Sequence, residues 1–227
     1  MIEILGAALT PISDKEGLEA LLSDGFRSVW QERHRGLREP SARCASLVGI
    51  LLLQAAGVVG KLSYDRLGRP YLLDALVDFN VTHTDGYVFC AIERCDAENS
   101  FDTPRVGIDA EEMTSRNNPR RADMASRWFS ADEQRLFFAD PTEECFLRLW
   151  TRKESLIKWT GEGMRSLAES DTLNAERTHG VRFQDYREGS ALISLCHRVG
   201  TSPPQNIRIF SIDELSRLCE KSKTSLQ

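Results

Sequence analysis

Hydrophobic residues recur along the chain with both helical and strand spacings, so the sequence predicts a mixture of helices and strands. Residues 2–8 are typical of a strand, and residues 42–59 fit a helix. The uncharged stretch at residues 44–60 contains three glycines and Gln54, and it falls short of the ~20 apolar residues that a membrane span needs. We therefore expect a buried helix there and no contact with a membrane.

Apolar and polar residues alternate on both sides of Asp85-Gly86. An Asp-Gly pair between two alternating runs is a strong signal for a β-hairpin, because these residues accept the backbone angles of a tight turn. The polar residues Thr82, His83 and Thr84 come directly before this turn. The sequence therefore predicts that their side chains lie near the tip of a hairpin.

The remainder of the chain contains further helical and strand patterns. Residues 95–105 are polar and turn-rich and are the best candidate for a linker, and the arginine-rich residues 114–127 read as a loop. Helices are expected at residues 129–139, 142–160 and 211–223, and strands from residue 105 and at residues 182–183, 191–196 and 206–210. This order predicts an α+β fold with two halves, residues 1–103 and 104–227, around a shared core.

Composition and charge narrow the class of protein. The 227 residues are 41% hydrophobic, and the net charge of −5 argues against bulk binding of nucleic acid. The six cysteines include no C-x-x-C pair, so we expect no zinc site and reduced thiols. The first residues lack the basic segment of a signal peptide, and we expect a cytoplasmic monomer.

Two carboxylates, Asp109 and Glu111, stand two residues apart at the end of an apolar strand. Strand periodicity puts both side chains on one face, where they repel each other unless a cation or a proton lies between them. Mg²⁺ takes hard oxygen ligands of this kind and completes its coordination with water and phosphate. The pair therefore indicates a magnesium site, although an exposed acidic strand end fits the same pattern.

The helix expected at residues 142–160 carries charges beside its apolar stripe. On a helical wheel Lys153 falls within the stripe, and Glu154 and Lys158 lie together along its edge, one turn apart. A solvated ion pair explains Glu154 and Lys158 but not Lys153, because a lysine that faces the interior needs a partner of opposite charge. A metal-bound pyrophosphate would interact with all three side chains.

Together these motifs resemble those of the phosphopantetheinyl transferases. Residues 106–113, VGIDAEEM, match the family motif G-(I/V)-D-x-E, and residues 128–164 match F-(S/A)-x-x-E followed by W-x-x-K-E-(S/A)-x-x-K at the family's spacing. Upstream, GRPYL and NVTHTDGY are similar to stretches of the larger, Sfp-type branch. The resemblance covers residues 42–210, which is most of the chain.

The resemblance implies a fold and a reaction. Members are pseudo-dimers of two similar α+β halves that bind coenzyme A between them. They transfer its 4'-phosphopantetheine arm to a serine of an acyl or peptidyl carrier protein, require Mg²⁺ and release adenosine 3',5'-bisphosphate. Two alternatives stay open: a Mg²⁺-dependent phosphohydrolase that acts on coenzyme A or a nucleotide, and a carrier-binding module without catalysis.

The resemblance also implies roles for the charged residues of both motifs. Asp109, Glu111 and Glu154 match the family's three magnesium carboxylates, and Glu154 or a metal-bound water would accept the serine proton. Lys158 matches the lysine at the phosphates, and Trp150 and Lys153 match positions that shape the site. The expected catalytic residues are Glu154, Lys158 and Asp109.

Coenzyme A contacts are expected mainly from the first half. By resemblance they come from Arg69, Pro70, Thr82, His83, Thr84, Lys153 and Lys158. The chain departs from the family at the arginine that holds the 3'-phosphate. Arg43 is the nearest match, and Arg33, Arg35 and Arg38 are the alternatives.

A basic stretch followed by an apolar helix indicates where a carrier protein would bind. Residues 114–127 contain four arginines in an otherwise acidic protein, and the next helix carries Phe129, Leu136, Phe137 and Phe138. Carrier proteins of the family's substrates present an acidic helix, so we expect the arginines to steer the carrier and one or two apolar residues to form its docking patch.

Overall fold

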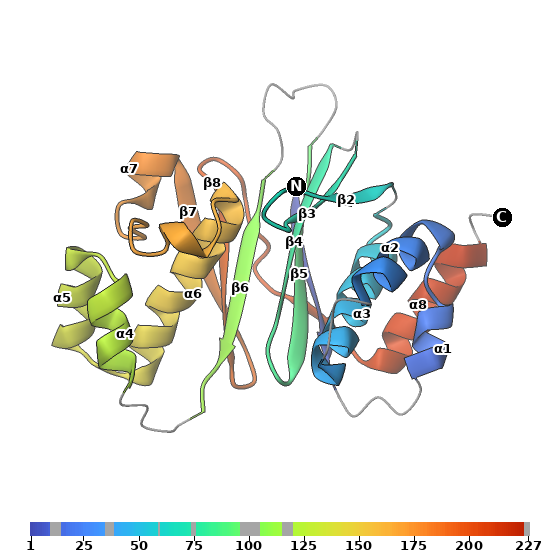
Figure 1. Cartoon of the computed structure of the whole chain (residues 1–227), viewed down its shortest axis with the longest axis horizontal. Helices are drawn as coiled ribbons and strands as arrows, with labels where there is room; N and C mark the ends of the chain where they lie inside the picture. Colours follow the sequence, from blue (N-terminus) through green and yellow to red (C-terminus); the bar gives the residue numbers. More distant parts are fainter. Residues whose placement is uncertain are drawn as a thin grey trace.

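Two β-sheets lie at the centre of the molecule, with helices on the outer side of each (Figure 1). The computed structural model describes residues 1–9, 15–34, 39–58, 60–73, 76–95, 105–114 and 120–224. The α+β class expected from the sequence is confirmed. That the two halves are similar to each other stays a prediction.

The first sheet has four strands. In spatial order they are β4 (Val77–His83), β5 (Tyr87–Arg94), β1 (Ile2–Ala8) and β9 (Arg208–Phe210). The predicted hairpin at Asp85-Gly86 is confirmed as the turn between β4 and β5, with His83 opposite Val88. The helices on the outer side of this sheet are α1 (Lys15–Ala20), α2 (Asp24–His34), α3 (Pro40–Ala55) and α8 (Ile212–Thr224). Strands β2 (Leu62–Tyr64) and β3 (Pro70–Leu72) form a small separate hairpin.

The second sheet has three strands. In spatial order they are β6 (Gly107–Glu112), β8 (Ala191–Arg198) and β7 (Val181–Glu188), all antiparallel to their neighbours. Its helices are α4 (Arg120–Trp128), α5 (Ala131–Ala139), α6 (Glu143–Thr160) and α7 (Ala175–His179), with a short 3₁₀ turn, η1 (Met164–Ser166), after α6. Helix α6 packs on β6 and β8, so its residues lie close to the edge strand of this sheet.

Apolar side chains of both sheets form one cluster between them. Ile4 and Phe89 of the first sheet belong to the same cluster as Ile108 and Ile193 of the second. A larger cluster fills the space between the first sheet and its helices, and nine residues of α3 are buried there. The predicted buried helix is therefore confirmed. Among the described residues, no helix has the length and apolarity that a membrane crossing requires.

The end of the chain returns to the first half. Strand β9 pairs in parallel with β1, where Leu5 lies opposite Arg208, and α8 packs against α3. The Cys219 thiol of α8 donates to the Leu51 carbonyl at 3.5 Å. The division at residues 103 and 104 stays a prediction, and by packing the last strand and helix belong with the first half.

Two expected loops are wrong in part. Residues 120–128 form α4, because the apolar residues Met124, Ala125 and Phe129 pack against α6, and arginine is itself a good helix former. The polar, arginine-rich sequence of residues 30–40 also predicts a connector, but this stretch is helical at both ends, since α2 runs to His34 and α3 begins at Pro40. Most of the expected linker, residues 96–104, lies outside the described residues.

Candidate active site

Helix α6 carries Glu154 and Lys158 of the candidate site, and capping residues define both of its ends. The Thr142 hydroxyl accepts a hydrogen bond from the Cys145 N–H, and Gly161 ends the helix in the left-handed conformation at φ 76°. The helix approaches β6 closely at Gly107, where a Cβ would lie 2.0 Å from the Ser155 carbonyl oxygen. The glycine of the G-I-D-A-E stretch is thus required to let α6 lie against the strand that carries the acidic pair.

The two signature motifs meet at Asp109. Its side chain is buried, and Oδ1 lies 2.7 Å from Lys158 Nζ and accepts from the Thr82 hydroxyl at 3.1 Å. Lys158 Nζ also donates to the Ile108 carbonyl at 3.0 Å. The second carboxylate oxygen, Oδ2, is buried and has no hydrogen-bond partner among the residues that the structure describes. A buried, unpartnered carboxylate oxygen is costly and indicates a place where a further positive group can bind.

Two further carboxylates lie beside Asp109. Burial and then the charge of Asp109 raise the pKa of both Glu111 and Glu154 to about 7, against the opposing effects of Lys158 and a hydrogen bond from Trp150. The charge of Glu111 adds to the effect on Glu154. The structure therefore brings Asp109, Glu111 and Glu154 close enough for their charges to interact, and the charge of Lys158 offsets their repulsion only in part.

The donor set fits a divalent cation by its chemistry. Within the part of the chain that the structure describes, no three histidine, cysteine, aspartate or glutamate side chains are arranged so that they could hold a metal ion. Even so, the unpartnered Asp109 oxygen and the mutual repulsion that, after burial, raises the pKa of Glu111 and Glu154 indicate that these hard oxygen donors would gain from a nearby cation. These are the ligands that Mg²⁺ prefers.

Lys153 has a different partner from the one expected. Its ammonium group is fully buried, lies 2.8 Å from Glu133 Oε2 and also donates to the Ser170 carbonyl. Glu133 in turn accepts from the Thr172 N–H at 2.8 Å and from the Thr172 hydroxyl at 2.7 Å. The lysine therefore links α6 to α5 and to residues 170–172. It does not face the carboxylates of the candidate site.

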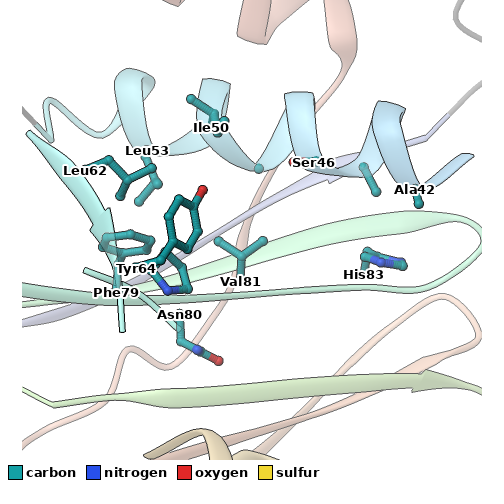
Figure 2. Close-up of a pocket in the computed structure, with 13 residues that line it drawn as sticks. Ala42, Ser46, Ile50, Leu53, Leu62, Tyr64, Phe79, Asn80, Val81 and His83 are labelled. Atoms are coloured by element: carbon teal, nitrogen blue, oxygen red, sulfur yellow. The ribbon is translucent and has the colours of Figure 1, made fainter. Parts of the chain in front are cut away.

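The polar residues of the β4 hairpin divide between its two faces. Thr82 points toward Asp109, whereas Val81 and His83 lie on the side of α3 and line a pocket there (Figure 2). This pocket has a volume of about 200 Å³ and is also lined by Ser46 and Pro70. The hydroxyl of Thr84 accepts from the N–H groups of Gly86 and Tyr87 and so belongs to the turn.

The arginines that were expected to contact coenzyme A lie in different parts of the structure. Arg69 Nη2 lies 2.5 Å from Asp78 Oδ2 and 3.1 Å from the Val106 carbonyl, and Nη1 donates to the Lys158 carbonyl. Its side chain is only 14% exposed. Arg43 lies half-buried in the first turns of α3, next to pocket residue Ala42. The side chain of Arg33, and Arg35 and Arg38, lie outside the described residues.

The partner of Lys153 and the contact made by Asn80 were not predicted from the sequence. Glu133 was visible as the glutamate of a capping box with Ser130, whose side chains and backbone N–H groups bond reciprocally. Asn80 Oδ1 accepts from the Ile108 N–H at 3.0 Å, next to Asp109. The available signal was that Asn80 lies on the polar face of β4, in phase with Asp78 and Thr82.

The raised pKa of Glu154 predicts a pH-dependent effect on stability. The fold favours the protonated form, so this residue's contribution is greatest below its ordinary pKa of 4.5 and is lost as the pH rises to about 7. Glu154→Gln cannot ionise, and we expect it to unfold less readily than the parent at pH 8, by roughly 1–3 kcal/mol. At pH 4 the difference should vanish.

Urea unfolding at pH 4 and pH 8, in the presence of a chelator, measures this difference. Glu169→Gln, at an exposed position, is the matched control and should show no such change with pH. A difference between Glu154→Gln and the parent that is equal at both pH values would contradict the electrostatic account of this site.

Comparisons with known proteins agree with these motifs. The family model of the 4'-phosphopantetheinyl transferase superfamily matches residues 105–217. The 4'-phosphopantetheinyl transferase HetI of Nostoc sp. (strain PCC 7120 / SAG 25.82 / UTEX 2576) is 29% identical over 171 residues, covering 70% of this chain and 68% of that protein. The 4'-phosphopantetheinyl transferase Sfp of Bacillus subtilis (strain 168) is 33% identical over 109 residues, or 46% of this chain and 42% of Sfp. The match thus spans less than half the length of Sfp.

Proposed function

We propose, because this chain belongs to the 4'-phosphopantetheinyl transferase superfamily, that it transfers the 4'-phosphopantetheine arm of coenzyme A to a serine of a carrier protein and releases adenosine 3',5'-bisphosphate. The observation that carries the proposal is the meeting of the two signature motifs. Lys158 on α6 contacts Asp109 on β6, and Glu111 and Glu154 lie within electrostatic reach. Phosphoryl transfer depends on positioning and on neutralisation of charge, which such a cluster supplies.

Asp109, Glu111 and Glu154 are the proposed ligands of one Mg²⁺. When bound, this ion would neutralise pyrophosphate oxygens and stabilise the leaving bisphosphate. Lys158, whose side chain is 29% exposed, is proposed to turn from Asp109 to a phosphate oxygen. Glu154, or a water bound to the metal beside it, is proposed to accept the proton of the attacking serine.

Coenzyme A is proposed to lie over the side of β4 that faces α3. His83 and Pro70 line the pocket beside α3, and Arg43 on the same helix is the proposed contact of the 3'-phosphate. Thr82 and Thr84 would lie near the phosphates at the end of this strand. We leave Arg69 out of the set, because its guanidinium group is already bound by Asp78 and two backbone carbonyls.

Incubation of the protein with coenzyme A, Mg²⁺ and an apo carrier protein tests the proposal, with the intact mass of the carrier as the readout. A gain of one phosphopantetheinyl group supports transfer. Consumption of coenzyme A without that gain indicates a phosphohydrolase instead.

We also propose that the active protein is a cytoplasmic monomer with reduced cysteines.

The surface of α5 is the proposed docking patch for the carrier. Leu136 and Phe138 are each 48% exposed, whereas Phe129 and Phe137 are buried among aromatic neighbours. Among the arginines of the preceding segment, Arg121 pairs with Glu143 on α6 and is mostly buried. We therefore assign the apolar part of docking to Leu136 and Phe138.

The double variant Leu136→Ala, Phe138→Ala should raise the KM for the carrier by about tenfold or more, because interface aromatics carry much of the binding energy. The KM for coenzyme A should stay the same. Both side chains are already exposed, so the thermal midpoint should change little. Val199→Ala, at a position that is 38% exposed in the turn after β8, is the control. An unchanged carrier KM in the double variant would exclude this patch.

A further inference from the structure

The edges of the two sheets run side by side at β4 and β6 (Figure 1). Both are the end strands of their sheets, and the described strands form no backbone ladder between them. The backbone N–H groups on this side of β6 still need partners, because an unpaired buried N–H group is costly. The site carboxylates Asp109 and Glu111 stand on this same strand.

Side chains of alternate β4 residues take the place of the missing ladder. Asp78 Oδ2 accepts from the Val106 N–H at 2.9 Å, Asn80 Oδ1 accepts from the Ile108 N–H at 3.0 Å, and the Thr82 hydroxyl donates to Asp109 at 3.1 Å. Beyond the end of β4, the Gly86 N–H donates to Glu112 Oε1 at 2.7 Å. We call this row of contacts the β4–β6 seam.

Asn80 occupies the centre of the seam, next to the site. It is buried, and the residue it holds, Ile108, is fully buried directly before Asp109. The carbonyl of the same Ile108 accepts from Lys158 Nζ. The backbone of Ile108 is therefore bound at its N–H group by β4 and at its carbonyl group by α6. The Asp109 side chain likewise lies between Thr82 of β4 and Lys158 of α6.

From this geometry we propose that Asn80 is a positioning residue: it sets the place of β6 against β4, and so the place of Asp109 relative to Lys158. It acts through the backbone of Ile108 and touches neither carboxylate of the acidic pair. Its effect on the reaction rests on the proposed function, whereas its effect on the strand does not. Because small misplacements of reacting groups slow catalysis steeply, the effect should fall on kcat.

An alternative role for Asn80 is a direct contact with coenzyme A. It is also among the residues that line the pocket beside α3, where coenzyme A is proposed to bind. In Figure 2 its side chain points to the side of β4 away from α3. A coenzyme A contact would change the KM for coenzyme A, whereas a positioning residue would change kcat.

Three variants separate these roles. Asn80→Leu keeps the approximate size but removes the acceptor, and Asn80→Asp retains an acceptor oxygen on the same branch. Ile92→Val, on the neighbouring strand and in the core beside α3, lowers stability without touching the seam. For each variant we would measure the amide hydrogen exchange rate of Ile108, the thermal midpoint, kcat, and the KM for coenzyme A.

We expect Asn80→Leu to raise the exchange rate of the Ile108 amide and to lower kcat by about ten- to a hundredfold, with less than about a twofold change in KM. Asn80→Asp should restore the protection of Ile108 and recover part of kcat. Ile92→Val should lower the thermal midpoint but leave the exchange rate of Ile108 and kcat at the parent's level. An unchanged kcat in Asn80→Leu, or a raised KM with an unchanged kcat, overturns the proposal.

The exchange measurement also separates this inference from the proposed function. If the parent transfers nothing to any carrier, the proposed function fails, while protection of Ile108 that depends on residue 80 still supports the positioning of the strand. If transfer occurs but Ile108 is equally protected in the parent and in Asn80→Leu, the proposed function stands and the role of Asn80 is excluded.

Discussion

Replacing Asp109 by alanine is expected to lower the rate of phosphopantetheine transfer by at least about a thousandfold, because the change removes both a proposed metal ligand and the partner of Lys158. The fold should survive. The Asp109 Oδ2 atom has no hydrogen-bond partner within the described segments, and Lys158 keeps its hydrogen bond to the Ile108 carbonyl.

Asp109→Asn refines this result, because it keeps the shape of the side chain and removes its charge. We expect a large loss of activity here too, with a raised requirement for Mg²⁺. Glu169→Gln, an exposed charge removal elsewhere, should retain the parent's activity. Activity of Asp109→Ala equal to the parent's, at saturating coenzyme A, would contradict the assignment of the site.

Replacing Lys153 by methionine is expected to destabilise the protein by about 3–5 kcal/mol, because it leaves Glu133 as an uncompensated buried charge. Both side chains of this pair are 0% exposed. For a chain of this size, such a loss corresponds to a fall in the thermal midpoint on the order of 10 °C. The remaining hydrogen bonds of Glu133 to Thr172 and Ser130 soften the effect and do not cancel it.

Arg148→Met provides the matched control for this prediction. Arg148 pairs with Glu144 on the same helix, but their side chains are 46% and 45% exposed, so the loss should stay below about 1 kcal/mol. At a temperature where Lys153→Met is folded, its KM for coenzyme A should equal the parent's, in contrast to the phosphate contact expected from the sequence. A raised KM with unchanged stability would restore that earlier assignment.

The local elements of the site were predictable from the sequence. The apolar stripe of α6, the hairpin at Asp85-Gly86 and the acidic pair on β6 all follow from short-range periodicity. The need of Lys153 for a buried partner was also predictable from the cost of burying a charge. The identity of that partner was not, since Glu133 lies 20 residues earlier on another helix.

The contacts between the halves could not be predicted in the same way. Asn80 and Ile108 are 28 residues apart, and no periodicity links a side chain of one strand to a backbone group of another. The close approach at Gly107 likewise depends on the packing of α6 on β6. Helix α4 was missed because its arginines resemble a solvated loop, whereas Met124 and Ala125 attach it to the core of the second half.

Measurement of both products of one reaction tests the proposed transfer. The protein, coenzyme A and Mg²⁺ are incubated with an apo carrier protein, and in parallel with the same carrier in which alanine replaces the target serine. We expect that each modified carrier gains one phosphopantetheinyl group, that an equal amount of adenosine 3',5'-bisphosphate appears, and that the alanine carrier yields neither. Consumption of coenzyme A at the same rate with both carriers, and no gain of mass on either, would contradict it.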